Sequence, residues 1–303
     1  MSEIAIVTDS NSGITQSEAK ELGIYVLPMP FEINGKTYYE DIDLTQDQFY
    51  EMLADPNTEV HTSQPLPGEV MGLWDRLLKD HDEIIHIPMS SGLSGSCESA
   101  KLFAEDYDGR VEVVNNQRIS VTQKLSCLDA QHMAKNGMTA AQIREKLEKT
   151  KFDSNIFITV DTMKYLKKGG RVTPAAAAIA EFLNIKPVLR IYGEKLDAFA
   201  KARGMKAAKQ VMIKSIRDDL EKNYGGVDPD HPNAWIGMAH THNDEAGQEF
   251  MEEVKAAFPG YHVYMDPLSL SVACHIGPGS LAVACTRILP EGIRYGEDES
   301  RLF

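Results

Sequence analysis

The sequence predicts an α/β protein with two domains. Through the first half, short apolar runs alternate with stretches of helical period, a pattern typical of a doubly wound, mostly parallel sheet covered by helices. Near residue 154 the pattern changes to mixed hairpins and crossovers, which predicts an α+β domain from there on. No low-complexity linker separates the halves. We therefore expect two packed domains, 1–153 and 154–303, with a ligand cleft between them.

In the first half, the expected strands are apolar runs and the expected helices are amphipathic stretches with capping residues. The Asn34-Gly35 pair, between β-rich runs at 24–33 and 36–39, predicts a hairpin on or beside the parallel sheet. Further strands are expected at 4–7, 83–87 and 111–114, and helices at 15–22, 45–54, 67–80, 121–136 and 139–149.

In the second half, Gly193-Glu194 separates two strand-like runs, 186–192 and 195–200, and predicts a second hairpin. The stretch 274–280 contains Gly277-Pro278-Gly279 and predicts a sharp loop that carries His275. Residues 201–204 are expected to lead into a long helix that ends near Tyr224. Other strands are expected at 155–160, 234–239, 261–265 and 281–285, and helices at 164–171, 174–183 and 245–257.

Composition excludes several classes of protein. The 303 residues are 43% hydrophobic and carry a net charge of −14, which argues against nucleic acid and allows at most transient contact with anionic membrane. The four cysteines form no CxxC pair, so reduced thiols in the cytoplasm are expected rather than disulfides or zinc. Neither a signal peptide nor a membrane-spanning segment is predicted.

Three loops rich in hydroxyl groups follow predicted strands, at 8–13, 62–64 and 90–96. Ligands of doubly wound sheets bind outside the carboxyl ends of strands, and a glycine-rich turn into a helix suits an anion. A plainer explanation is helix capping, by Ser94 or Ser96 in one loop and by Ser63 in another. The sequence leaves both explanations open.

Motifs for common catalytic chemistry are missing. There is no GxGxxG or P-loop motif, and Ser96 stands where a nucleophile elbow around Ser94 requires glycine. His240, His242 and Asp244 lack the spacing of a metal motif. His275 has either a structural role or a role as donor or base. The remaining set of neutral donors, one histidine and two loop arginines fits the binding of a carboxylate or phosphate better than chemistry on it: Thr62, Ser91, Ser94, Ser96, His275, Arg171 and Arg203.

Six motifs, in this order, resemble the DegV family of fatty-acid-binding proteins, which includes the FakB subunits of bacterial fatty acid kinase. They are Thr8-Asp9-Ser10, Thr62-Ser63-Gln64-Pro65, Ser91-Gly92-Leu93-Ser94-Gly95, Gly170-Arg171-Val172, Lys186-Pro187-Val188 and His275-Ile276-Gly277-Pro278-Gly279. The resemblance covers roughly residues 3–290. Leu66 and Cys97 depart from the family pattern.

The resemblance implies one long-chain fatty acid buried between two domains, with no cofactor and no catalysis by this chain. Thr62, Ser94 and His275 match the family's carboxylate-binding positions, and Ser63, Ser91, Gly95 and Ser96 belong to the supporting loops. A separate ATP-dependent kinase subunit would phosphorylate the carboxylate, and the acyl phosphate would enter phospholipid synthesis. Arg203, and less directly Arg171, resemble positions that engage the kinase.

Two alternatives remain. An acyl hydrolase or transferase would use Ser94 as nucleophile and His275 as base, but the sequence offers no clear third member of a triad. A binding protein for another acyl or isoprenoid ligand would use the same loops. The sequence predicts neither the chain length of the ligand nor the oligomeric state.

Overall fold

The computed structural model describes residues 3–178 and 185–296, which fall into two compact units. Unit 1 comprises Met1–Lys151 and Leu289–Ile293, and unit 2 comprises Phe152–Ile288 and Arg294–Phe303. Leu289–Ile293 belongs to unit 1 although it follows the last strand of unit 2. The backbone N–H of Ile293 donates to the Asp129 carboxylate at 3.0 Å, which fixes this segment in unit 1.

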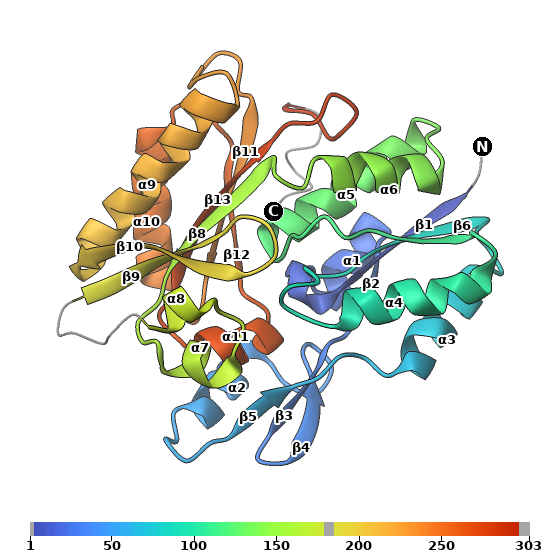
Figure 1. The fold of residues 1–303 in the computed structure, drawn as a ribbon, viewed down its shortest axis with the longest axis horizontal. Coiled ribbons are helices and arrows are strands. Elements are labelled where there is room, and N and C mark those ends of the chain that lie inside the picture. Colours follow the sequence, from blue (N-terminus) through green and yellow to red (C-terminus); the bar gives the residue numbers. More distant parts are fainter. Residues whose placement is uncertain (1–2, 179–184, 297–303) are drawn as a thin grey trace. The chain divides into compact units, whose positions relative to one another are not determined.

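Unit 1 is built on a parallel sheet with strand order β2-β1-β6-β7. The helices α3 and α4 cover one face, and α5 and α6 cover the other (Figure 1), so the predicted doubly wound fold is confirmed. The elements are β1 (Ile4–Asp9), α1 (Gln16–Leu22), β2 (Tyr25–Leu27), α3 (Pro67–Leu77), β6 (Glu83–Ile87), α4 (Ser96–Ala104), β7 (Val111–Val113), α5 (Val121–Lys135) and α6 (Ala140–Lys149), with 3₁₀ turns at Ser10–Ser12 and Glu105–Tyr107.

The face of this sheet under α3 and α4 holds an apolar core around Trp74. Trp74 is completely buried, and Tyr107 packs edge-to-face against it at a centroid distance of 5.3 Å. Val7 and Ile84 come from neighbouring strands and share the cluster. Aromatic and branched side chains of this size stabilise the fold by about 1.5–3 kcal/mol each when fully buried.

The early hairpin forms as predicted, but it does not join the parallel sheet. Asn34 and Gly35 adopt positive φ angles of 50° and 79°, the conformation that a two-residue hairpin turn needs. The hairpin, with a third short strand, makes a separate antiparallel sheet of order β4-β3-β5, accompanied by α2. Its elements are β3 (Pro30–Ile33), β4 (Lys36–Tyr39), α2 (Gln46–Leu53) and β5 (Val60–Thr62).

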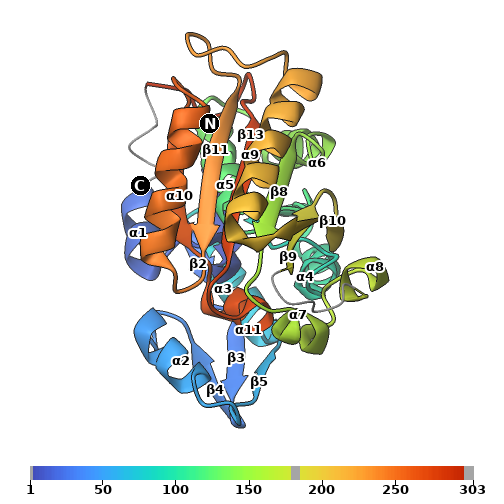
Figure 2. The ribbon, with the colours of Figure 1, turned by 90° about the vertical axis from the view of Figure 1, so that its left-hand side faces the viewer.

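Unit 2 is built on a mixed sheet with strand order β10-β9-β8-β13-β11-β12, in which β11 and β12 pair in parallel and the other neighbouring strands pair antiparallel. Figure 2 shows α9 and α10 lying along this sheet, and their apolar side chains form one buried cluster with it. The elements are β8 (Ser154–Thr159), α7 (Lys164–Gly169), α8 (Pro174–Ala177), β9 (Ile185–Ile191), β10 (Leu196–Arg203), α9 (Gly204–Asn223), β11 (Ala234–His240), α10 (Asp244–Ala257), β12 (Val263–Pro267), α11 (Leu270–Ile276) and β13 (Leu281–Arg287).

Several local predictions were wrong. His275 was expected in a loop but lies in the last turn of α11, a short helix that packs against α7. Thr62 was also expected in a loop, but it pairs with Phe31 at the end of β5. The strand expected at 195–200 is longer than predicted, because β10 continues to Arg203, and the long helix then begins at Gly204 and is capped by Tyr224 as expected. The alanine-rich helix expected at 174–183 is helical over Pro174–Ala177 and its further part, 179–183, lies outside the described residues.

Candidate functional site

Two of the predicted hydroxyl-rich loops follow β1 and β6, which are adjacent parallel strands, so the loops lie side by side in unit 1. Asp9 joins them. Its buried carboxylate accepts hydrogen bonds from the backbone N–H of Met89 at 2.8 Å and of Asn11 at 3.0 Å. The Gln123 amide adds a bond to Asp9 at 3.2 Å. Burial raises the pKa of the Asp9 carboxyl, and these donors oppose that shift. Asp9 thus holds the start of the serine-rich loop.

The serine-rich loop 90–96 uses its own polar groups to form the turn into α4. The Ser94 hydroxyl accepts the backbone N–H of Ser96 at 3.2 Å, and Ser91 accepts the side-chain amide of Asn115 at 2.8 Å. Gly95 is the N-cap of α4 and provides no side-chain cap. Neither Ser94 nor Ser96 is therefore the N-cap of α4, although the Ser94 hydroxyl bonds the first backbone N–H of the helix from the position before the cap. Ser63 does not cap α3 either, because the N-cap of that helix is Leu66.

Gln64 connects the serine-rich loop with the loop that follows Thr62. Its side-chain Oε1 accepts the Ser99 hydroxyl at 3.1 Å and lies 3.3 Å from the position of a Cβ at Gly95. A larger residue at position 95 would crowd this oxygen. Gln64 was not among the predicted site residues, although it belongs to the Thr62-Ser63-Gln64-Pro65 motif. Its role in joining the two loops is evident only from its contacts with Ser99 and Gly95 in the folded protein.

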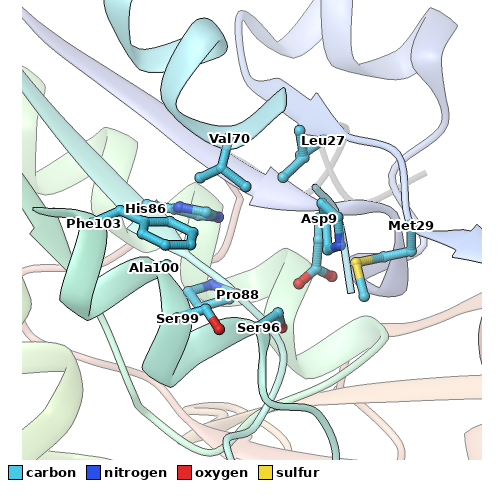
Figure 3. A pocket seen from close by; sticks show the side chains of 11 residues that line it. Asp9, Leu27, Met29, Val70, His86, Pro88, Ser96, Ser99, Ala100 and Phe103 are labelled. Carbon is cyan, nitrogen blue, oxygen red and sulfur yellow. The ribbon is translucent and has the colours of Figure 1, made fainter. Parts of the chain in front are cut away.

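The two loops border a narrow cavity in unit 1, which we call the unit 1 cavity (Figure 3). Its volume is about 10 Å³, room for roughly one water molecule, so a larger guest requires the surrounding side chains to move. Figure 3 shows Asp9 and Met29 on one side and Phe103 and His86 on the other. The walls are mostly apolar and come from Asp9, Leu27, Met29, Pro65, Val70, His86, Pro88, Ser96, Ser99, Ala100 and Phe103.

Cys97 follows Ser96 in α4 and is completely buried. Burial raises the pKa of its thiol to about 12, so the thiol stays protonated at neutral pH and is unsuited to nucleophilic attack. Cys97 therefore supplies no reactive thiol to this part of unit 1. All four cysteines are free and buried, as the sequence predicts.

In unit 2, α7 and α11 bring His275 and Arg171 together. Burial and, to a smaller extent, the nearby positive charge of Arg171 together lower the pKa of His275 to about 4. The Arg171 guanidinium also donates to the Gly169 carbonyl at 2.6 Å, at the end of α7. At neutral pH the His275 imidazole is uncharged, with one N–H donor and one acceptor nitrogen.

The other predicted arginine, Arg203, is exposed at the end of β10, where Gly204 adopts a φ of +80° and α9 begins. Within the part of the chain that the structure describes, no group of three or more histidine, cysteine, aspartate or glutamate residues could hold a metal ion. None of the described helices combines the length and the apolar character that crossing a bilayer requires.

The parallel sheet of unit 1 and the mixed sheet of unit 2 define a two-unit α/β protein. The profile described as "Uncharacterised protein, DegV family" matches residues 3–287, and the chain belongs to the DegV family. It is 30% identical over 285 residues to a DegV domain-containing protein of Deinococcus radiodurans, covering 93% of this chain and 97% of that one.

Two solved structures share the fold over nearly the whole chain. A DegV family protein from Thermus thermophilus, described for its fatty acid binding, aligns with a TM-score of 0.85 at 27% identity, covering 94% of this chain and 100% of that one. DegV from Bacillus subtilis, described as a fatty acid binding protein, aligns with a TM-score of 0.82 at 27% identity, covering 95% and 100%.

Proposed function

We propose that this protein binds one long-chain fatty acid, whose carboxylate is held by Thr62, Ser94 and His275. The observation that carries the proposal is the link through Gln64, which joins two hydroxyl-bearing loops beside a mostly apolar cavity. Ser63, Ser91, Gly95 and Ser96 belong to these loops and support them. The likeness to two structures described for fatty acid binding supports the same ligand.

The energetics of such a ligand suit neutral donors. Burying about 15 methylene groups at about 0.8 kcal/mol each contributes roughly 12 kcal/mol before entropic costs. The acyl chain would therefore supply most of the affinity. The head group needs only satisfied hydrogen bonds, which hydroxyl groups and an uncharged imidazole provide. An acyl chain is larger than the unit 1 cavity, so its binding requires side chains such as Phe103 and Met29 to shift.

We further propose that the protein acts as a carrier for a separate fatty acid kinase. The kinase would transfer the terminal phosphoryl group of ATP to the bound carboxylate, and the acyl phosphate would enter phospholipid synthesis. Arg171 and Arg203 are exposed cations that suit a polar partner surface. In this scheme the carrier itself catalyses nothing.

Mass spectrometry tests the ligand. The protein is purified under mild conditions, denatured and extracted with organic solvent, and the extract is compared with one from an unrelated protein prepared in the same way. We expect a long-chain fatty acid close to one equivalent per chain. An extract without fatty acid, together with no binding of added palmitic or oleic acid, would contradict the proposal.

The carrier role has its own test. The loaded protein is incubated with ATP and a purified fatty acid kinase subunit, and acyl phosphate is trapped with hydroxylamine. We expect hydroxamate only when both proteins are present, and a lower rate with Arg203→Ala at unchanged fatty acid affinity. A serine-directed covalent probe that labels Ser94 would instead favour the hydrolase alternative.

A further inference from the structure

His86 is a polar side chain in the apolar face of the parallel sheet. It belongs to β6, two residues after Ile84, which packs in the apolar cluster around Trp74. The His86 imidazole meets Trp74 edge-to-face at a centroid distance of 5.5 Å. Only 2% of His86 is exposed. Neither ring nitrogen has a hydrogen-bond partner among the described residues.

This imidazole lines the unit 1 cavity (Figure 3). The Ser96 hydroxyl lines the same cavity and likewise has no hydrogen-bond partner among the described residues. Buried polar groups in native proteins are nearly always hydrogen-bonded, and each one left unpaired is destabilising. The cavity wall therefore presents donor and acceptor capacity to whatever enters it.

The protonation state of His86 restricts what it can bind. Burial lowers the pKa of His86 to about 4, so at neutral pH the ring offers one N–H donor and one acceptor nitrogen. A hydroxyl group also both donates and accepts. A methylene group does neither, and a charged group would lose its hydration on entering this apolar wall. Among the groups that commonly substitute an acyl chain, a hydroxyl is thus the one that matches both capacities of the ring and could replace a water molecule there.

We propose that His86, with Ser96 in the same wall, makes the unit 1 cavity selective for a fatty acid that carries a hydroxyl group on its acyl chain. This inference rests on the proposed fatty acid binding and specifies the class of acid. The apolar side chains Val70 and Phe103 would contact the methylene groups, and His86 would bond the hydroxyl.

Competition binding tests this selectivity. Stearic acid and its 3-, 10- and 12-hydroxy derivatives each displace a fluorescent fatty acid from the wild-type protein and from His86→Phe. Phenylalanine keeps a ring of similar size and removes both nitrogens. We expect at least one hydroxystearic acid to bind the wild type about tenfold more tightly than stearic acid. In His86→Phe that preference should disappear.

Two more variants separate the hydrogen bond from packing. His86→Gln keeps a donor and an acceptor and should retain part of the preference, while Ser96→Ala should reduce it by less than His86→Phe does. The inference is overturned if the wild-type protein binds stearic acid at least as tightly as every hydroxy acid. This outcome is measured on the wild-type protein alone, so it does not depend on whether a variant folds. It is also overturned if the preference survives in His86→Phe. If the wild type binds none of the acids, the proposed function itself fails.

Discussion

Gly169 packs directly against His275 in unit 2. A Cβ built at Gly169 would lie 2.1 Å from Nδ1 of the imidazole and 3.1 Å from both Cγ and Cε1. No real Cβ approaches another atom this closely, so any other residue at position 169 displaces the ring. The end of α7 thereby fixes the position of a side chain in α11.

Gly169→Ala should weaken fatty acid binding by about tenfold, because it moves the proposed carboxylate donor His275 without altering it. The measurement is a double-mutant cycle of fatty acid affinity with His275→Ala. In the His275→Ala background, Gly169→Ala should have no further effect. Gly68→Ala is the matched control, because a Cβ there meets no atom within 4 Å and the affinity should be unchanged. Additive losses in the cycle would show that Gly169 does not act through His275.

Ser94→Ala should weaken fatty acid binding by about 1–3 kcal/mol, the effect of leaving a carboxylate oxygen unpaired. The same change removes the acceptor for the Ser96 N–H and should lower the free energy of unfolding by about 1 kcal/mol. Calorimetric titration and urea unfolding measure the two effects separately. Ser17→Ala, at an exposed position in α1 whose hydroxyl bonds that of Thr15, should leave fatty acid binding unchanged. Wild-type affinity in Ser94→Ala would remove Ser94 from the site.

Local signals in the sequence predict the framework of the fold. Apolar runs indicate the parallel strands, and the Asn34-Gly35 turn indicates the hairpin, because both depend on residues close together in the chain. The helix α11 was missed, since its seven residues precede a Gly-Pro-Gly turn and it packs on the distant helix α7. The strand β5 has three residues and forms by pairing with β3. Such short elements depend on tertiary contacts.

The candidate site was predictable only in part. The loops 62–64 and 90–96 are conspicuous in the sequence because they concentrate hydroxyl groups. Gln64 and His86 gave no comparable signal. One is a polar residue in a polar loop, and the other is a single histidine in an apolar run. The role of Gln64 follows from its contacts with Ser99 and Gly95 in the folded protein. The role of His86 follows from its packing against Trp74 and its place in the cavity wall.

Glu18→Gln should lower the free energy of unfolding by about 3 kcal/mol, measured by urea unfolding. Glu18 lies 2.7 Å from Lys124, whose side chain is only 1% exposed, so the substitution removes a carboxylate charge from beside a buried ammonium group. Glutamine keeps the capping interaction with Thr15, which separates the charge from the cap. Glu98→Gln breaks an exposed pair with Lys101 and should change stability by less than about 1 kcal/mol. Equal effects of the two substitutions would contradict the role of burial.

His86→Phe should make the protein more resistant to acid. The pKa of His86 is about 4 in the folded protein, below the value of about 6.5 expected when unfolded. Between these values the unfolded chain binds the proton more readily, so acidification favours unfolding from about pH 6.5 down to about pH 4.

Relative to His86→Phe, the wild type should therefore lose about 2 kcal/mol of stability between pH 7 and pH 5, and nothing further below pH 4. Urea unfolding at half-unit pH intervals measures the difference. His231→Phe is the control, because His231 is largely exposed beside Asp228 and its replacement should change the stability little. A constant difference between wild type and His86→Phe across this range would mean that His86 has the same pKa in the folded and the unfolded protein, and would contradict the lowered pKa.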